Sequence, residues 1–242
     1  MKIATWNLNN RVGKVRFRPE AAEAAMALNA DVLVFTEFFP RQHEDQFRDT
    51  LSRAGWTSQV MSAQPTEVAN RVLIASRLPL VPLPIELPTF DQQFPANVAA
   101  VFMPSTGVSI VGARVPAYTA GESPLLRGAW EWLEMSAALL CGRPAVILGD
   151  LNVSTTSSIS RGGTHFRRIL AAGWQRATPA DGATFYGHNG RTSEIDHILT
   201  TVHCTITEAE CIKCAGRFDY CGSPNAISDH AALVCRVELA TC

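Results

Sequence analysis

Ala145–Asn152, with the sequence AVILGDLN, is the stretch that decides the fold, because it leads an apolar run directly into a carboxylate and an amide. The run Ala145–Gly149 has the length and branched side chains typical of a β-strand, and Asp150 and Asn152 follow at its end. Taken alone, GDLN is equally typical of a simple turn in which Asn adopts a left-handed conformation. The interpretation therefore depends on whether other strands end in the same way.

Seven further runs have the composition of strands. Most hold four to eight residues rich in Val and Ile, and they are bounded by Pro, Gly, Ser or Asn. They are Lys2–Asn7, Asp31–Glu37, Arg71–Ser76, Asn97–Met103, Val108–Val115, Glu194–Thr200 and His230–Leu239. Within Arg71–Val115 and Glu194–Leu239 several strands follow one another without a helix, which indicates strand-to-strand meanders.

Four stretches between these runs predict helices. One apolar stripe at steps of three and four residues is formed by Leu126, Trp130, Leu133, Ala137 and Leu140. The other helices are predicted at Pro19–Leu28, Arg41–Ala54 and His165–Ala172. Strict βαβ repetition would predict one parallel sheet, and this order of elements departs from it. We therefore predict an α+β fold of two mixed sheets packed face to face, with helices on the outer faces, as a single domain over residues 1–242.

Polar side chains stand where five of the strands begin or end. The carboxyl ends carry Asn7, Glu37 and Asp150, whereas the amino ends carry Asp196, Asp229 and His230. Antiparallel neighbours place opposite strand ends on one rim of a sheet, so these residues are expected to meet there. Each of them alone would also fit a turn or a solvated strand end. Their recurrence at the edges of apolar runs favours a shared site.

Carboxylates, amides and one imidazole are the groups that hold a hard divalent cation and activate water against a phosphate ester. Glu37 is the best metal ligand in this set, and Asn9 and Asp229 are plausible helpers, since Mg²⁺ needs only one or two carboxylates. Asp150 can accept a proton from an attacking water. Asn152, two residues on and so expected on the same strand face, can donate hydrogen bonds to a phosphate oxygen.

His230 is expected to bind the phosphate as a cationic donor, provided that Asp196 lies close enough to raise the pKa of its imidazole. The simpler alternative is a surface histidine at a strand start.

The segments IATWNLN, DVLVFTE, RVLIASRLPL, VILGDLNVS, EIDHILT and SDHAALVCRV, between residues 3 and 237, together resemble the endonuclease/exonuclease/phosphatase superfamily. The resemblance implies a four-layer α/β/β/α sandwich and a Mg²⁺- or Mn²⁺-dependent phosphoesterase. It is specific for the superfamily and for none of its branches.

The resemblance also implies roles for individual residues. Glu37 corresponds to the metal ligand, Asn7 and Asn9 line the metal and phosphate site, and Asp229 lies beside the metal. Asp150 corresponds to the general base or water-positioning group, Asn152 contacts the phosphate, and Asp196 orients His230.

Three positions depart from the family pattern. Arg114 stands where members usually carry a His or Tyr that touches the phosphate, and Arg cannot act as a general acid because it keeps its proton. Arg114 is expected to clamp a phosphate or to be a surface residue, and Tyr118 could supply a hydroxyl if its loop folds back. Asn9 replaces a frequent Asp, which is expected to weaken the metal site. Glu194 replaces a frequent Arg and either adds negative potential or points to solvent.

The cysteines allow two interpretations. Cys204, Cys211, Cys214 and Cys221 have the spacing C-x6-C-x2-C-x6-C, which could hold a structural zinc but is not a common zinc pattern. Otherwise they are reduced thiols, as expected for a cytoplasmic chain, and Cys141 and Cys235 are expected in the core.

Charge and hydropathy limit the classes of partner that we expect. The formal net charge is −1, whereas proteins that grip long duplex DNA usually show a basic footprint. Candidate local basic groups are Arg11, Lys14, Arg16 and Arg18, and Arg161, Arg167 and Arg168. No run approaches the roughly 20 apolar residues of a membrane span, and the N-terminus lacks a signal-peptide layout, so we expect a cytoplasmic monomer without membrane insertion.

We therefore expect a phosphate-ester substrate, with DNA or RNA as the leading candidate. A phosphatase or phosphodiesterase of a small molecule or phospholipid headgroup is the alternative among enzymes. A catalytically inactive binding module is the alternative outside them.

Overall fold

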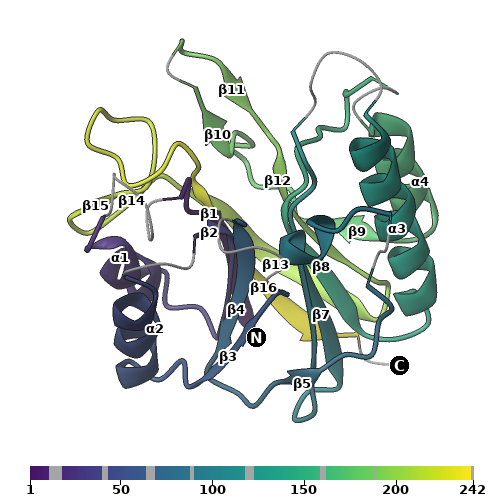
Figure 1. Ribbon diagram of the computed structural model, residues 1–242, viewed down its shortest axis with the longest axis horizontal. Helices are drawn as coiled ribbons and strands as arrows, with labels where there is room; N and C mark the ends of the chain where they lie inside the picture. Colours follow the sequence, from purple (N-terminus) through teal and green to yellow (C-terminus); the bar gives the residue numbers. More distant parts are fainter. Residues whose placement is uncertain are drawn as a thin grey trace.

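Two mixed β-sheets lie face to face in the computed structural model, and helices cover their outer faces (Figure 1). The structure describes residues 1–10, 18–39, 43–63, 69–87, 90–117, 123–158, 162–187 and 189–240. Within these ranges each of the two sheets has six strands. The predicted sandwich of two sheets is confirmed.

The first sheet contains, in spatial order, β13 (Cys204–Ile212), β16 (Ala232–Leu239), β1 (Lys2–Asn7), β2 (Val32–Phe38), β4 (Arg71–Ser76) and β3 (Ser58–Met61). The second contains β5 (Val81–Pro82), β6 (Val98–Met103), β7 (Val108–Ala113), β8 (Ala145–Asp150), β12 (Asp196–Thr200) and β9 (Gln175–Arg176). Two hairpins stand apart, β10 (Phe185–Tyr186) with β11 (Thr192–Ser193), and β14 (Cys214–Ala215) with β15 (Phe218–Asp219). Parallel pairs, β1 with β2 and β7 with β8, make both sheets mixed.

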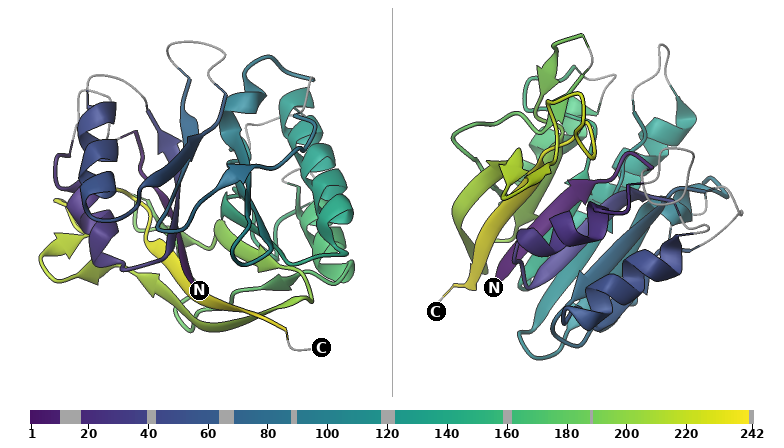
Figure 2. Two further views of the ribbon diagram at one scale, coloured as in Figure 1. Left: turned by 90° about the horizontal axis from the view of Figure 1, so that it is seen from below. Right: turned by 90° about the vertical axis from the view of Figure 1, so that its left-hand side faces the viewer.

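Helices form the two outer layers. Figure 2 (left) shows α1 (Ala21–Ala27) and α2 (Glu44–Arg53) on one side of the sheets, and α3 (Pro124–Leu140) and α4 (Gly163–Ala171) on the other. A short 3₁₀ helix, η1 (Phe94–Asn97), precedes β6. None of the helices in the described ranges is long and apolar enough to span a membrane.

Three apolar cores separate the four layers. In β2, Leu33 and Phe35 pack toward α1 and α2, whereas Val32 and Val34 pack toward the second sheet. A third core lies between the second sheet and α3 and α4. Because both faces of the central strands are buried, these strands have continuous apolar sequences instead of alternating ones. Their sequences therefore locate the strands without assigning their faces.

All eight predicted strands and all four predicted helices are present, with ends displaced by a few residues. The prediction of two meanders is wrong in part, because β4 and β13 belong to the first sheet while β5, β6, β7 and β12 belong to the second. Residues 77–80 and 201–203 carry the chain from one sheet to the other. A crossing of this kind leaves no periodic signal in the sequence.

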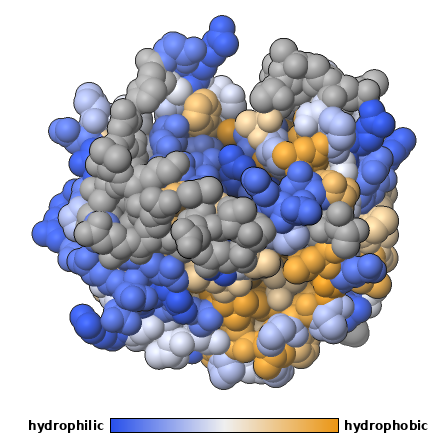
Figure 3. Space-filling view, in the orientation of Figure 1, coloured by the Kyte–Doolittle hydropathy of each residue, from blue (hydrophilic) through white to orange (hydrophobic). Residues whose placement is uncertain are grey.

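The ends of the central strands meet at one rim. β8 and β12 pair in antiparallel fashion, with Asp150 opposite Asp196. β1 and β2 run in parallel, with Asn7 opposite Thr36, so Glu37 follows at the same edge. β10 and β11 project beyond this rim in Figure 1. The rim is largely hydrophilic on the face drawn in Figure 3, whereas hydrophobic residues gather lower down, around β5.

Gly149 lets β8 pass close to β7 just before Asp150. Its φ is +142°, and a Cβ atom built there would lie 1.9 Å from the backbone oxygen of Ala113. Only glycine combines this φ with such a close approach to a neighbouring backbone. This explains physically why a glycine precedes Asp150 in GDLN.

We expect Gly149→Ala to lower the free energy of unfolding by roughly 2–4 kcal/mol, because the added methyl group must displace backbone atoms. Urea unfolding followed by circular dichroism measures this loss. Gly142→Ala is the matched control, since no atom of a residue other than Gly142 and its two chain neighbours lies within 4 Å of the position its Cβ would take. Equal stability of the two variants would contradict the argument.

His197 lies on β12 next to Asp196 but faces the opposite way, toward α4. Its ring packs 4.6 Å from that of Phe166, and its Nε2 lies 2.7 Å from the backbone oxygen of Val153, where an N–H donor is required. Burial lowers the pKa of His197 from 6.5 to about 4. The imidazole is therefore neutral in the folded protein at neutral pH.

The unfolded chain binds a proton at His197 below pH 6.5, whereas the folded protein does so only below about pH 4. The free energy of unfolding should therefore fall as the pH drops through this window, by at most about 1.4 kcal/mol per pH unit. His197→Gln keeps an N–H donor but cannot titrate, so this pH slope should be smaller in the variant. Urea unfolding between pH 4 and 7 tests this, and identical slopes would overturn it.

Candidate active site

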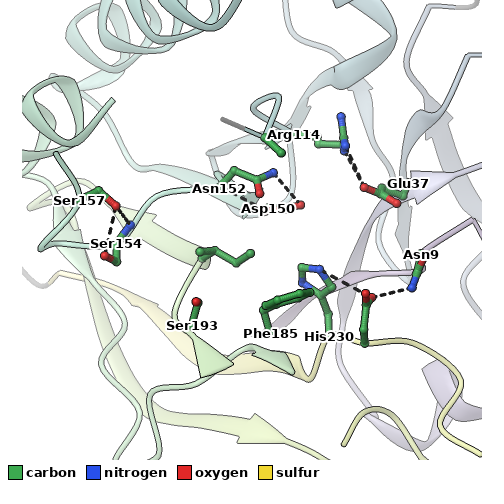
Figure 4. Close-up of a pocket in the computed structure, with 13 residues that line it drawn as sticks. Asn9, Glu37, Arg114, Asp150, Asn152, Ser154, Ser157, Phe185, Ser193 and His230 are labelled. Atoms are coloured by element: carbon green, nitrogen blue, oxygen red, sulfur yellow. Dashed lines mark hydrogen bonds and ion pairs between the residues drawn. The ribbon is translucent and has the colours of Figure 1, made fainter. Parts of the chain in front are cut away.

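A polar cavity of about 460 Å³ opens at the rim where the two sheets meet (Figure 4). It is lined by Asn9, Glu37, Arg114, Ala117, Asp150, Asn152, Ser154, Ser157, Phe185, Ser193, Ile195, Asp229 and His230. The lining comes from both sheets and from the β10–β11 hairpin. The structure thus brings together most of the residues that the sequence selected.

Asp150, at the end of β8, is buried and held by three N–H donors. Asn7 Nδ2 and Asn152 Nδ2 donate to Asp150 Oδ2 at 2.8 and 3.0 Å, and the backbone N–H of Asn152 donates to Oδ1 at 3.1 Å. Burial, followed by the neighbouring Asp196 carboxylate, raises the pKa of Asp150 to about 7. A carboxyl group with such a pKa can exchange a proton near neutral pH.

Asn152 reaches Asp150 in a different way from the one expected. We expected it to share a strand face with Asp150, but β8 ends at Asp150. Asn152 instead has a φ of 50°, and its amide also donates to the backbone oxygen of Val115 at 2.8 Å. A left-handed turn, which asparagine tolerates, therefore points the side chain back to the carboxylate.

His230 lies just before β16 and faces Asp196. Its Nδ1 is 2.7 Å from Asp196 Oδ2, and its ring packs 5.2 Å from the ring of Phe185. Burial alone would lower the pKa of His230, but the charge of Asp196 and the hydrogen bond to it raise the pKa to about 9. The imidazole is therefore a cation at neutral pH, with Nε2 as its remaining donor.

Buried contacts hold the backbone of His230. Trp6 Nε1 donates to the His230 backbone oxygen at 3.0 Å, and the His230 backbone N–H donates to Ser228 Oγ at 3.1 Å. Ser228 Oγ in turn donates to the Asn7 backbone oxygen at 2.7 Å. The segment Ser228–His230 is thereby fixed to β1, and the side chain of Asn7 at the end of β1 donates to Asp150.

Glu37 projects from a bulge in β2. The register between β2 and β4 shifts between Phe35 and Phe38, and Glu37 has a φ of 50°. Its Oε2 accepts a hydrogen bond from Asn10 Nδ2 at 3.0 Å. Its Oε1 accepts from Arg114, whose Nε and Nη2 lie 3.0 and 2.9 Å away.

Asn9 and Asp229 form the neighbouring wall. Asn9 Nδ2 donates to Asp229 Oδ1 at 2.7 Å, and the Asn9 backbone N–H donates to Asn7 Oδ1 at 2.8 Å. His230 Nε2 lies 3.9 Å from Asp229 Oδ1. The sequence thus brings an amide, a carboxylate and an imidazole into one corner of the cavity.

Unusual backbone conformations concentrate at this site. In the described part of the chain six residues other than glycine have positive φ, and four of them, Asn9, Asn10, Glu37 and Asn152, belong to the site. Asparagine tolerates this region, whereas a residue such as glutamate pays about 1–3 kcal/mol for it. Glu37 is therefore held in place by its surroundings at an energetic cost.

The residues present suit a hard divalent cation. Glu37 and Asp229 supply carboxylate oxygens, and Asn10 Oδ1 is buried without a hydrogen-bond partner although its Nδ2 touches Glu37. No group of three or more His, Cys, Asp or Glu side chains suited to a metal occurs among the described residues. Two carboxylates supplemented by an amide oxygen match Mg²⁺, which usually keeps several waters and takes one or two carboxylates.

Some sequence-based expectations are not tested by the structure, and others have a different outcome. Tyr118, Arg11, Lys14, Arg16 and Arg161 lie outside the described residues. Glu194 pairs with Arg176 and so does not stand alone beside the cavity. The other basic candidates have acceptors on the protein itself: Arg18 near Glu20, Arg168 near Glu134, and Arg167 on the backbone oxygens of Thr155 and Ser157.

The zinc interpretation of the cysteines is not supported. Cys204 lies on β13 and is buried, Cys211 is half-buried on the same strand, and Cys214 is exposed on β14. They belong to no metal-binding group among the described residues. Cys235 is buried as expected, but Cys141 is exposed, because it caps α3 after the apolar stripe has ended.

Sequence reasoning missed several lining residues. Asn10, which bonds to Glu37 without lining the cavity, also escaped prediction because it lies beyond the end of the first strand. Phe185, Ser193 and Ile195 come from the β10–β11 hairpin and the segment before β12, which carries a weak strand signal. Ser154 and Ser157 line the side of the cavity away from Glu37 and Asn9 (Figure 4).

Solved structures with the same fold cover nearly the whole chain. A 3′ phosphatase, NExo, from Neisseria, bound to a product DNA hairpin, has a TM-score of 0.76 at 23% identity, covering 98% of this chain and 99% of its own. An AP endonuclease from Archaeoglobus fulgidus has a TM-score of 0.71 at 19% identity, covering 99% and 100%. The catalytic domain of human Nocturnin with bound sulfate has a TM-score of 0.66 at 18% identity, covering 99% and 93%.

Among curated protein sequences none matches this chain significantly. The model of the Endonuclease/Exonuclease/phosphatase family, by contrast, matches residues 4–230, which span the whole site from Asn7 to His230. Members of this family are hydrolases that act on phosphate esters. The chain belongs to the Endonuclease/Exonuclease/phosphatase family.

Proposed function

We propose that this protein is a divalent-cation-dependent phosphodiesterase that hydrolyses nucleic acid with an activated water. The observation that carries the proposal is that one cavity is lined by both a carboxyl group and an imidazolium with shifted pKa values. Asp150 is a buried carboxyl group with a pKa of about 7, and His230 is an imidazolium held by Asp196. One suits a proton acceptor and the other suits a phosphate-binding cation.

Glu37 and Asp229, with the amide oxygens of Asn9 and Asn10, are the residues that would hold the cation. When bound, a divalent cation polarises a phosphoryl oxygen and neutralises the charge that develops on it. The side of the cavity formed by Glu37, Asn9 and Asp229 is therefore the metal side, and Asp150 and Asn152 lie beside it (Figure 4).

Asp150 accepts the proton of the attacking water in this mechanism. Its Oδ2 receives two amide donors, whereas its Oδ1 receives the backbone N–H of Asn152, so Oδ1 has more room for a further hydrogen bond. The amides of Asn7 and Asn152 fix the carboxylate so that it need not reorient when the proton arrives. Asn152 also lines the cavity and can contact a phosphate oxygen.

His230 binds a phosphoryl oxygen through Nε2, while Asp196 holds Nδ1 and keeps the ring charged. Arg114 supplies a second cationic donor at the same cavity. Phosphates are bound well by such charge-assisted hydrogen bonds, which are shorter and stronger than neutral ones. Tyr118 stays a candidate substrate residue from the sequence alone.

Nucleic acid is the substrate class that the fold relatives favour, since they include a phosphatase bound to a DNA hairpin and an AP endonuclease. A small phosphate ester is the second candidate. One observation favours it: the formal net charge of the chain is −1, and two described members of the basic groups, Arg18 and Arg168, each lie near a carboxylate that partly offsets their charge toward a long polyanion.

We expect Asp150→Asn and His230→Ala each to reduce kcat by roughly 10²–10⁴-fold, because each removes a proton acceptor or a cationic donor. Circular dichroism and thermal unfolding should show that both variants fold. Asp49→Asn, which makes the same type of change on the exposed face of α2, is the control and should keep full activity. Near-wild-type turnover in Asp150→Asn or His230→Ala would overturn the assigned roles.

A substrate panel with Mg²⁺ or Mn²⁺ tests the function itself. It contains 3′-phosphorylated, abasic and nicked duplex DNA, single strands, RNA, inositol phosphates, sphingomyelin and an aryl phosphodiester. We expect turnover of a nucleic acid, and its loss when EDTA removes the cation. Turnover of small esters alone would favour the second candidate, and inactivity on every substrate would favour a binding module.

A further inference from the structure

The guanidinium of Arg114 contacts a carboxylate oxygen of Glu37 that a metal ion would also bind. Both Nε and Nη2 of Arg114 lie within 3.0 Å of Glu37 Oε1. Asn10 Nδ2 takes Oε2 of the same carboxylate. Two donors fill the lone-pair positions of Oε1, whereas Oε2 keeps one. A divalent cation therefore either replaces the guanidinium on Oε1 or binds Oε2 beside it, where its double positive charge repels the guanidinium.

The backbone at Arg114 is fixed, so only its side chain can move. Its N–H donates to the Asn97 backbone oxygen at 2.8 Å, and the N–H of Val115 donates to the Asp150 backbone oxygen at 2.9 Å. The Val115 oxygen in turn accepts from Asn152 Nδ2. The guanidinium is therefore attached beside the very residues that would face the phosphate.

The pair is partly shielded from water. The side chains of Arg114 and Glu37 are 21% and 15% exposed, and both line the cavity. Screening is weaker there than at the surface, so the pair persists until a competing cation arrives. Arg114 also keeps N–H groups that bond to no described residue, and these can serve a phosphate.

We propose that Arg114 is a displaceable cation: it neutralises Glu37 before the metal binds, and the metal releases it to bind the substrate phosphate. This inference rests on the proposed function, because it takes Glu37 as a metal ligand. Metal binding removes the partner of Arg114, and a phosphate provides a new one. Cation and anion should therefore bind cooperatively, each raising the affinity for the other.

Arg114→Met keeps the length of the aliphatic stem and removes the charge. Without substrate, this variant should bind Mn²⁺ about tenfold more tightly than the wild type, because a positive charge has left the site. Titration of free Mn²⁺ by electron paramagnetic resonance measures this without any catalysis. Arg114→Gln is a second neutral variant in case the first does not fold.

Sulfate serves as the tetrahedral anion in the same titration. It should tighten Mn²⁺ binding severalfold in the wild type and less in Arg114→Met. Arg236→Met is the matched control. Arg236 Nε bonds to Glu208 Oε2 at 3.0 Å, and neither residue lines the cavity, so losing this Arg–Glu pair should leave both effects unchanged.

Two outcomes would overturn the inference: Mn²⁺ affinity in the neutral Arg114 variants equal to or below the wild-type value, or an undiminished effect of sulfate. Glu37→Gln separates this failure from that of the proposed function. It should weaken Mn²⁺ binding at least tenfold. If Glu37→Gln binds Mn²⁺ as the wild type does, the metal assignment of Glu37 is wrong.

Discussion

The hydrogen bond from Asn7 Nδ2 to Asp150 Oδ2, 2.8 Å long and buried, connects the two sheets where the site forms. Asn7 ends β1 of the first sheet, and Asp150 ends β8 of the second. A buried carboxylate is tolerated only when donors satisfy it, so the two sheets must stay in register at this point. Several other site residues extend from this contact: Glu37 at the end of β2, parallel to β1, and Asn152 and Asp196 at the ends of β8 and β12. Arg114 follows β7 and His230 precedes β16 at the same rim.

The charges around this contact offset one another although the site holds several carboxylates. Asp150 and Asp196 are register partners on neighbouring strands, and like charges placed opposite each other are unfavourable. The cation of His230 relieves this repulsion through Asp196, and the raised pKa of Asp150 allows partial protonation. Electrostatic strain within the fold is thus converted into the proton-exchange properties that a hydrolase requires.

Much of this arrangement could be predicted from the sequence, since strand ends are marked by the change from branched apolar residues to Asn, Asp or Glu. What escaped prediction depends on tertiary structure. The sequence allows a left-handed turn at Asn152 but does not show that this turn points the side chain back to Asp150, and it does not reveal that Glu37 sits on a bulge. Nor does it reveal that Arg114 faces Glu37 across the two sheets, since these residues are 77 positions apart. Short hairpins such as β10–β11 lack enough periodic residues to be recognised.

The balance of charges at the site favours binding of the cation before binding of the substrate. Four carboxylates, those of Glu37, Asp150, Asp196 and Asp229, surround the cavity or support it, against one imidazolium and one guanidinium. A phosphate ester would add negative charge to a site that already has an excess of it. On the proposed function, a divalent cation removes that excess and at the same time frees the guanidinium, which then faces the incoming anion. On the same proposal, Arg114, which stands where the family resemblance implies His or Tyr, adds no proton to the reaction but makes phosphate binding depend on the metal.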